Sequence, residues 1–353
     1  MKAVTVRPGE AASISLDDWP EPEAGPGDLL VQALALGVCG TDREIIAAEY
    51  GQAPPGATRL VLGHESLGRV LKAPANSQFA EGDLVVGIVR RPDPVPCAAC
   101  AGGEWDMCRN GRYTERGIKE AHGYGAERFA LETGFAVKLD ASLGALGVLL
   151  EPASILAKAW DHIERIGHRT RTWRAGKVLV TGAGPVGLLA ALMSRQRGCE
   201  VHVYDHNRAG AKAALVRDLG GAYHDGELAE LDDLAPDVVI ECTGAAPVIA
   251  ALATRLGHNG ILCLAGISAP GAAVAFDMGG FDRTTVLQND VIFGAVNANR
   301  GHYEAAARSL AQADRAWLQR LITRRVPLAN WREAFEDRPD DVKVVLELQA
   351  PAP

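Results

Sequence analysis

The sequence has 353 residues and a formal net charge of -8, from 36 Lys and Arg against 44 Asp and Glu. Because no basic run offsets this acidity, the composition argues against nucleic acid or an anionic membrane as a partner. Hydrophobic residues (48%) and charged residues (23%) are in the usual globular proportion, which excludes a largely disordered chain, and the length predicts two domains rather than one.

The first part of the chain is predicted to be β-rich. From Lys2 to about Val89, short apolar runs alternate with turn residues, which is typical of short strands. The clearest of these runs are Asp28 to Leu36, Gly68 to Leu71 and Leu84 to Val89. A long loop with three cysteines follows them.

The N-terminus, Met1 to Glu10, has no apolar segment of the kind found in a signal peptide. The seven cysteines are an odd number, and Cys97, Cys100 and Cys108 lie within twelve residues of one another. In a reducing compartment such a group indicates a metal site rather than disulfides. We therefore expect a cytoplasmic protein without a membrane partner.

From Glu151 onwards, helices are predicted to alternate with strands. A helix is predicted at Ala153 to Ile166, and the strand-like run Val342 to Leu348 is expected to return to the first domain. Alternation of this kind indicates a parallel, doubly wound sheet. The other predicted strands are Val178 to Val180, Glu200 to Tyr204, Val238 to Ile240, Ile261 to Leu264 and Val291 to Ala295, and the other predicted helices are Arg208 to Leu219, Ala246 to Leu256 and Tyr303 to Ala313.

A glycine turn after the first of these strands predicts a dinucleotide site. Gly182, Gly184 and Gly187 form a G-x-G-x-x-G pattern. These glycines allow a sharp turn, a close approach to a pyrophosphate and close packing of helix on strand. The phosphates are expected on the free N–H groups of the helix start, where Pro185 fits the first turn. Asp205 is expected to accept the ribose hydroxyls, although a helix N-cap uses the same residue type.

Cys39 and His64 are candidate ligands of a catalytic zinc. Such a site takes three protein ligands, among them thiolate, imidazole and carboxylate, and leaves one position open. The third ligand is expected to be Glu151, with Glu65 as its rival, and Asp42 is expected to orient the histidine. Taken singly, each residue also fits a structural role, as a core cysteine, a buried histidine or a carboxylate at a helix start.

The motifs Gly37 to Asp42 and Gly63 to Glu65, together with the glycine turn, resemble the zinc-dependent medium-chain alcohol dehydrogenases over nearly the whole chain. The glucose 1-dehydrogenase branch is the more similar, and the residues that carry this likeness are Gly40 to Ile45, Val89 to Pro92, Thr114 to Tyr124 and Val296 to Asn299. The resemblance implies an α/β protein with two domains. These are a β-rich GroES-like catalytic domain, residues 1–158 completed by 297–353, and a doubly wound parallel-sheet (Rossmann) nucleotide-binding domain, residues 159–296.

The resemblance also implies roles for single residues. Cys39, His64 and Glu151 are expected to carry the catalytic zinc with Glu65 as an alternate ligand, and Thr41 is expected to touch the reacting hydroxyl. Glu115 and Asn297 are expected to bind sugar hydroxyls, and Glu151 to face both metal and sugar. Ile155 stands where some relatives have an Asp, so that contact to the sugar is absent. Cofactor contacts are expected at Gly182, Gly184, Pro185, Val186, Gly187, Asp205, His206, Arg208, Ala265, Gly266, Ile267, Ala295, Val296 and Asn297.

The implied reaction is oxidation of an aldose, glucose or galactose, at C1 to the aldonolactone, with hydride transfer to a nicotinamide. NAD is expected in preference to NADP, because the carboxylate of Asp205 repels a 2'-phosphate, although Arg208 offers a phosphate contact. A homo-oligomer, dimer or tetramer, is also expected. Two alternatives remain open: a zinc-dependent dehydrogenase of another polyol or alcohol, and a non-catalytic nicotinamide-binding redox sensor.

A second, structural zinc is expected in the cysteine loop. Relatives have four cysteines there, and the last three have the spacing of Cys97, Cys100 and Cys108. Asp93 stands near the place of the missing first cysteine, and its carboxylate can close a tetrahedral site. Asp106 is a weaker candidate ligand because it lies in the spacer before Cys108. A decayed site with three free thiols is the alternative.

Overall fold

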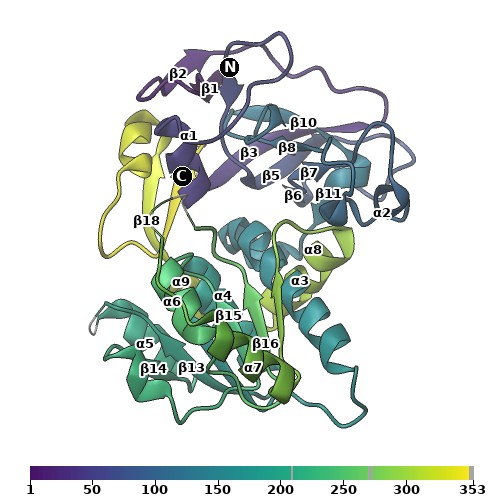
Figure 1. The fold of residues 1–353 in the computed structure, drawn as a ribbon. Helices are drawn as coiled ribbons and strands as arrows, with labels where there is room; N and C mark the ends of the chain where they lie inside the picture. Colours follow the sequence, from purple (N-terminus) through teal and green to yellow (C-terminus); the bar gives the residue numbers. More distant parts are fainter. Residues whose placement is uncertain (208–209, 269–270, 272, 350–353) are drawn as a thin grey trace. The chain divides into compact units, whose positions relative to one another are not determined.

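The structure, a computed structural model, describes residues 1–207, 210–268, 271 and 273–349 and forms two compact units (Figure 1). Unit 1 comprises Met1–Ser154 and Asn297–Pro353, and unit 2 comprises Ile155–Val296. The first boundary falls inside helix α3 (Leu150–Gly167), as does the expected boundary after residue 158.

Unit 1 is built around one long central strand. Its largest sheet has seven strands in the order β11-β6-β5-β3-β19-β18, with β10 also paired to β3. Strands β5, β10 and β19 all run antiparallel to β3. Two three-stranded sheets, β2-β1-β4 and β7-β8-β9, accompany it. The strands of unit 1 are β1 (Lys2–Val6), β2 (Ser15–Asp18), β3 (Asp28–Val38), β4 (Leu60–Val61), β5 (Glu65–Lys72), β6 (Leu84–Gly87), β7 (Arg90–Arg91), β8 (Thr114–Arg116), β9 (Glu120–Ala121), β10 (Arg128–Glu132), β11 (Ala136–Lys138), β18 (Ile322–Pro327) and β19 (Lys343–Glu347).

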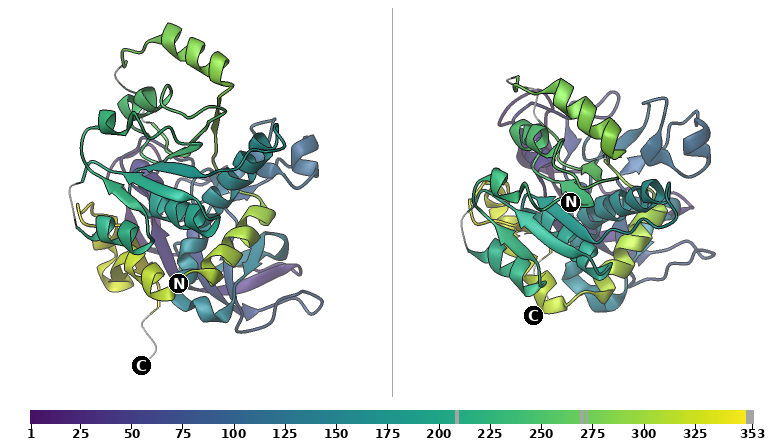
Figure 2. Two further views of the ribbon diagram at one scale, coloured as in Figure 1. Left: turned by 90° about the horizontal axis from the view of Figure 1, so that it is seen from below. Right: turned by 60° about the horizontal axis from the view of Figure 1, so that its bottom comes forward.

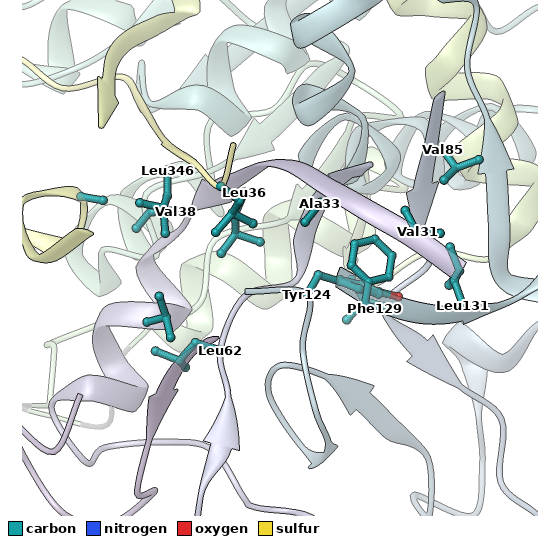
Figure 3. Packing of buried hydrophobic residues seen from close by; sticks show 14 of the residues in the cluster. Val31, Ala33, Leu36, Val38, Leu62, Val85, Tyr124, Phe129, Leu131 and Leu346 are labelled. Carbon is teal, nitrogen blue, oxygen red and sulfur yellow. The ribbon is translucent and has the colours of Figure 1, made fainter. Parts of the chain in front are cut away.

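The core of unit 1 lies on β3. Burial along this strand alternates up to Leu36, because successive side chains point to opposite faces, and the last residues are buried on both faces. Figure 3 shows Val31 beside the rings of Tyr124 and Phe129, whose centroids are 4.8 Å apart. The helices of unit 1 are short: α1 (Gly40–Ile46), α2 (Ala98–Ala101), α8 (Arg300–Gln312) and α9 (Arg315–Leu321), with 3₁₀ turns at Trp105–Met107, Thr133–Phe135, Ala141–Leu149 and Leu328–Phe335.

Unit 2 is the predicted doubly wound parallel sheet. Its strand order, β14-β13-β12-β15-β16-β17, reverses between β12 and β15, where doubly wound proteins bind ligands outside the carboxyl ends of the strands. The fold class expected from the sequence is confirmed. The elements of unit 2 are β12 (Lys177–Thr181), α4 (Pro185–Gln196), β13 (Glu200–Tyr204), α5 (Ala211–Asp218), β14 (Ala222–His224), a 3₁₀ turn (Leu228–Leu231), β15 (Val238–Glu241), α6 (Ala246–Leu252), β16 (Ile261–Leu264), α7 (Met278–Gln288) and β17 (Val291–Gly294).

Several elements differ from the sequence expectation. The helix predicted to run to Leu256 ends at Leu252, before a turn at the positive-φ residue Asn259. The helix predicted from Arg208 begins at Ala211, and Arg208 itself lies outside the described residues. Helices α1, α7 and α9 were not predicted. Helix α7 has no buried residue, so no apolar periodicity marked it, and it lies at the margin of its unit in both views of Figure 2.

One helical stretch among the described residues, Ala141–Gly167, is long and apolar enough to cross a membrane by length and composition alone. Its most apolar window is 72% buried inside the protein. It also contains Glu151 and Lys158, both buried. These are the properties of a core helix.

Candidate active site

Three candidate zinc ligands meet at one end of β3. Cys39 follows the last residue of β3 and caps the N-terminus of α1, whereas His64 and Glu65 lie where β5 begins. A thiol sulfur, an imidazole nitrogen and a carboxylate oxygen from these three lie within 4.8 Å of one another. These are donor types that zinc takes in catalytic sites, so this group, the zinc cluster, fits that ion.

Asp42 fixes the orientation of the histidine in the zinc cluster. Its Oδ2 accepts a hydrogen bond from the Cys39 backbone N–H (2.9 Å), and its Oδ1 lies 3.5 Å from Nδ1 of His64. Because Nδ1 faces Asp42, Nε2 is the nitrogen left for a metal. Burial by itself lowers the pKa of His64, but the charges of Asp42 and Cys39 outweigh burial and raise that pKa well above its usual value.

Glu65 is paired with a lysine that the sequence did not identify. Lys343, in β19, forms an ion pair with Oε2 of Glu65 and donates a hydrogen bond to the Val38 carbonyl (3.1 Å). The two charged side chains are 1% and 3% exposed. Gly37 of β3 packs against this ion pair, and a Cβ at this position would overlap the Glu65 carboxylate. The glycine is therefore required by the close approach of the ion pair.

Glu151, the expected third ligand, is not part of the zinc cluster, whereas its rival Glu65 is. Glu151 lies in the first turn of α3 and is 8% exposed. Burial is the main cause that raises the pKa of Glu151 to about 7, while His64 opposes this rise and Glu65 adds to it. Thr41 donates its backbone N–H to the Cys39 sulfur (3.4 Å). Cys39, His64 and Glu65 thus lie together, and Glu151 lies close enough for its pKa to respond to the charges of His64 and Glu65.

The expected sugar-binding residues, Glu115 and Asn297, are hydrogen-bonded to each other. Nδ2 of Asn297 donates to Oε1 of Glu115 (2.5 Å). Arg90, in β7, donates to the same oxygen through Nε (3.2 Å) and Nη2 (3.0 Å). Glu115 and Arg90 are both buried. All the hydrogen bonds described for this carboxylate fall on Oε1, so the lone pairs of Oε2 remain available to a further donor.

Arg90 also links this pair to the cysteine loop. Its Nη1 donates to the backbone carbonyl of Asp106 (3.1 Å), and its guanidinium lies 3.6 Å from the ring centre of Tyr113. The buried carboxylate of Asp106 accepts from Nδ2 of Asn299 (3.1 Å). Asp106, the weaker candidate for the second metal site, therefore takes part in the hydrogen bonds around Arg90 and Asn299.

The three loop cysteines form a second group of possible ligands. The sulfur atoms of Cys97, Cys100 and Cys108 lie within 4.8 Å of one another, which suits thiolates at a structural zinc. Backbone hydrogen bonds, chiefly from Arg109, lower the pKa of Cys97 to about 6, whereas burial raises the pKa of Cys100 to about 11. We call these three residues the thiol cluster.

The carboxylate of Asp93, the expected fourth ligand, is engaged outside the thiol cluster. Its Oδ1 accepts from the Val95 N–H (2.8 Å), and its Oδ2 accepts from Asn110 Nδ2 (2.8 Å) and Arg112 Nε (3.0 Å). Its backbone N–H, in contrast, is directed to the Cys100 sulfur. The backbone of Asp93 thus contacts the thiol cluster, while its side chain is hydrogen-bonded to other residues of the loop.

The glycine turn in unit 2 leaves space for a pyrophosphate. Gly182 has φ +90°, and a Cβ on Gly187 would overlap the Gly182 carbonyl. Gly184 has open space where a Cβ would stand, and it provides no side chain to bond the first N–H groups of α4, which starts with Pro185 and Val186. Open space beside unpaired helix N–H groups suits an anionic group, so these residues fit the implied dinucleotide.

Asp205 lies directly after β13 and beside the glycine turn. Its Oδ2 accepts from the Ala183 N–H (2.6 Å), and its Oδ1 accepts from the backbone N–H and Nδ2 of Asn207 (both 2.8 Å). The carboxylate is 6% exposed, so it is held inward rather than extended into solvent. His206 lies beside it with an exposed ring.

The remaining expected cofactor residues follow the last two strands of the sheet. Ala265, Gly266 and Ile267 follow β16, and Ala295 and Val296 follow β17. The N–H groups of Ala265 and Gly266 donate to the last carbonyl of β15 (2.8 and 2.9 Å). These positions are the carboxyl ends of parallel strands, the edge at which open sheets bind ligands.

Comparison with known proteins assigns the chain to a family. The model "Glucose dehydrogenase C-terminus" matches residues 144–348, and "Alcohol dehydrogenase GroES-like domain" matches residues 25–141. Glucose 1-dehydrogenase of Methanocella arvoryzae is 37% identical over 360 residues, which covers 99% of this chain and 100% of the relative. The chain belongs to the glucose dehydrogenase family.

Other members of the glucose dehydrogenase family match over similar lengths. Glucose 1-dehydrogenase 1 of Caldivirga maquilingensis is 38% identical, with 99% of each chain covered. Among solved structures, Haloferax mediterranei glucose dehydrogenase in complex with NADP, Zn and gluconolactone has a TM-score of 0.92 at 32% identity, and covers 99% of this chain and 100% of that chain. The resemblance inferred from the sequence motifs is confirmed.

In this member of the glucose dehydrogenase family, the buried Arg90 and Lys343 were not recognised from sequence as site residues, and Asp106 was considered only as a metal ligand. Arg90 holds Glu115, Asp106 anchors Arg90 and Asn299, and Lys343 pairs with Glu65. One signal was present for Lys343. It is a charged residue at the start of an apolar strand-like run, and a lysine buried in a strand requires a partner.

Proposed function

We propose that the protein oxidises an aldose, glucose or galactose, at C1 to the aldonolactone and transfers the hydride to a nicotinamide cofactor. The observation that carries this proposal is the buried Glu115 carboxylate with its hydrogen bond from Asn297, which leaves one carboxylate oxygen for substrate in the unit that holds the zinc cluster. Such a carboxylate recognises a hydroxyl that a simple alcohol lacks. The Haloferax relative holds gluconolactone, the product that glucose would give.

Different residues of the site have different roles in this reaction. When bound, zinc polarises the anomeric hydroxyl and the nicotinamide takes the hydride from C1. Asp42 would keep Nε2 of His64 available to the ion, and Thr41, the second residue after Cys39, would pass the hydroxyl proton outward. Glu115 holds the sugar ring through Oε2, while the glycine turn binds the cofactor pyrophosphate.

We expect aldohexoses to be oxidised with a much higher kcat/KM than simple alcohols or polyols. A simple alcohol lacks a second hydroxyl for the buried Glu115 carboxylate, and an open-chain polyol does not hold its hydroxyls in the fixed positions of a pyranose ring. A spectrophotometric screen of glucose, galactose, xylose, sorbitol, threonine and ethanol with both nicotinamides measures this. A higher kcat/KM with sorbitol or ethanol than with every aldose would support the polyol or alcohol alternative. Tight nucleotide binding without turnover of any of these compounds would support the redox sensor.

NAD is the cofactor that we propose as preferred, on the basis of Asp205. Its oxygens already accept backbone N–H groups but keep lone pairs for ribose hydroxyls, and its negative charge opposes a 2'-phosphate. The Haloferax relative and a putative zinc-binding dehydrogenase from Sinorhizobium meliloti, 25% identical, were solved with NADP. The proposal therefore rests on this chain's own carboxylate.

We predict that Asp205→Ser raises kcat/KM with NADP relative to NAD by about tenfold or more, because a charge of like sign to the 2'-phosphate is removed. Steady-state kinetics with both cofactors measures the ratio. His206→Ala is a matched control, since its ring is exposed and carries no negative charge. If the wild-type protein has the same kcat/KM with NADP as with NAD, the proposed preference is wrong.

We also propose that the thiol cluster holds a second, structural zinc. Three thiolates supply most of a tetrahedral site, and Asp93 reaches the fourth position if it exchanges its bonds to Asn110 and Arg112 for the ion. The lowered pKa of Cys97 favours the thiolate form that binds metal.

Metal analysis of the purified protein is then expected to give close to two zinc ions per chain, and Asp93→Ala should lose the loop ion while the zinc cluster keeps its own. Elemental analysis combined with thiol titration measures both. Arg112→Ala, which removes only a partner of Asp93, is the matched control and should keep both ions. One ion per chain with three titratable loop thiols would show that the second site has decayed.

The protein is proposed to form a homo-oligomer, dimer or tetramer, through the edge of the unit 2 sheet. Strand β17 is an edge strand, and its neighbour α7 exposes Met278, Val286 and Leu287 (64%, 67% and 64% exposed). An uncovered edge and apolar side chains of this kind mark an association surface. Light scattering after size exclusion should give a multiple of the 37.3 kDa chain mass, and a monomer at all concentrations would contradict the proposal.

A further inference from the structure

A pocket of unit 1 has no role in the reaction described so far. It has a volume of about 420 Å³ and lies between the segment that follows α1 and the loop that joins the parallel strands β8 and β9. The residues that the argument uses are Glu49, Tyr50, Gln52, Tyr113, Ile118 and Lys119. None of them belongs to the zinc cluster or to the sugar-binding pair. The volume lies within the range of about 300 to 1,000 Å³ that small-molecule sites occupy.

The pocket adjoins the sugar-binding carboxylate through two contacts. The ring of Tyr113, in the pocket wall, lies 3.6 Å from the Arg90 guanidinium, and Arg90 donates to Glu115 at 3.0 Å. Tyr113 and Glu115 are two residues apart in extended chain, so their side chains lie on the same side of the backbone. A ligand in this pocket therefore has the Glu115 subsite as its neighbour.

The loop between β8 and β9 also contacts the segment that carries His64. A Cβ on Gly117 would overlap the backbone of Gly63, the residue before His64. On the pocket side, the Gln52 N–H donates to the Ile118 carbonyl and the Glu120 N–H donates to the Gln52 carbonyl (both 2.9 Å). The loop between β8 and β9 is thus fixed between the pocket and the beginning of β5.

The wall of the pocket has the chemistry of a carbohydrate site. Tyr50, half exposed, presents an aromatic ring, which suits the C–H face of a pyranose, and the hydroxyls of Tyr50 and Tyr113 offer hydrogen bonds. Glu49 and Gln52 add acceptors, and the Lys119 ammonium lies 4.3 Å from the Tyr113 ring centre. Donors and acceptors around two rings match an uncharged polyhydroxylated ligand better than an apolar or a strongly anionic one.

We propose that this pocket is a second sugar subsite, which binds the non-reducing residue of a disaccharide while its reducing ring occupies the Glu115 and Asn297 site. This rests on the proposed function. The chemistry is the same as for a monosaccharide. The C1–H bond of the reducing ring breaks with hydride transfer to the nicotinamide, the anomeric hydroxyl loses its proton, and the product is the disaccharide lactone. The glycosidic bond stays intact.

The first test compares substrates and one tyrosine variant. Maltose, cellobiose and lactose are to be measured beside glucose, and we expect at least one of them to have a kcat/KM within about tenfold of that for glucose. Tyr50→Ala should lower the ratio of disaccharide to glucose kcat/KM by about tenfold, and Tyr50→Phe, which keeps the ring, should largely restore it. Tyr113 is not varied because its ring also packs on Arg90.

The second test does not depend on turnover. Methyl maltoside and methyl cellobioside cannot be oxidised at C1, and calorimetry should show that one of them binds more tightly than methyl glucoside, with the gain lost in Tyr50→Ala. If glucose is oxidised but no disaccharide is used and no disaccharide glycoside binds, the subsite is refuted and the proposed function stands. If such a glycoside binds in a Tyr50-dependent way but no aldose is oxidised, the proposed function fails and the subsite stands.

Discussion

Replacing Cys39 or His64 by alanine is expected to lower kcat by about three orders of magnitude or more. Each change removes a donor of the zinc cluster, and Lewis-acid stabilisation of several kcal/mol corresponds to such a factor. Activity with glucose and zinc content by elemental analysis are the measurements. Nucleotide affinity, followed by fluorescence titration, should change little, because the glycine turn and Asp205 belong to unit 2.

Cys199→Ala is the matched control for this experiment. Cys199 is a buried cysteine of unit 2 whose sulfur bonds only the Ala175 carbonyl among the contacts described, so its loss should leave kcat and zinc content near their original values. Full activity in Cys39→Ala or in His64→Ala would refute the metal assignment. Loss of activity with retained zinc would instead assign the residue a role other than binding the ion.

Lys343→Met is expected to lower the free energy of unfolding of unit 1 by about 3 to 5 kcal/mol, because it leaves the buried Glu65 carboxylate without its cation. Denaturant unfolding of chelator-treated protein measures this. The midpoint should be read for the transition of unit 1 alone, since a chain of two units need not unfold in one step.

Two further variants separate charge from shape in this pair. Lys343→Arg keeps the positive charge and should be less destabilising than Lys343→Met. Glu65→Gln combined with Lys343→Met removes both charges and should recover part of the lost stability. A Lys343→Met protein as stable as the original would show that the pair contributes no net stabilisation.

The fold was predictable from local patterns, whereas the site was predictable only where its residues lie in motifs. Gly182, Gly184 and Gly187 are close in sequence and serve one turn, so their spacing carries the structural information. Cys39 and His64 also lie in short motifs, and the structure brings them together. Helix α7 shows the converse, because its side chains are exposed and leave no apolar period in the sequence.

Residues that act across the sheet could not be predicted from sequence. The choice between Glu65 and Glu151 depends on how far each lies from Cys39 and His64, a distance that no local pattern contains. Lys343 reaches Glu65 only because β19 and β5 flank β3 on opposite sides. Asp93 stands by position where relatives have a cysteine, but the bonds of its carboxylate to Val95, Asn110 and Arg112 are visible only in the folded loop.

The position of Lys343 in the chain affects the order in which the two units fold during synthesis. Unit 2 is continuous in sequence, from Ile155 to Val296, and a ribosome releases all of it before the last part of unit 1. Domains generally fold as units in the order of their synthesis, so unit 2 is free to fold first. Unit 1 closes only when β19, which carries Lys343, pairs with β3. Until β19 has been synthesised, Glu65 has no lysine beside it, so the complete site forms only after unit 2 has been made.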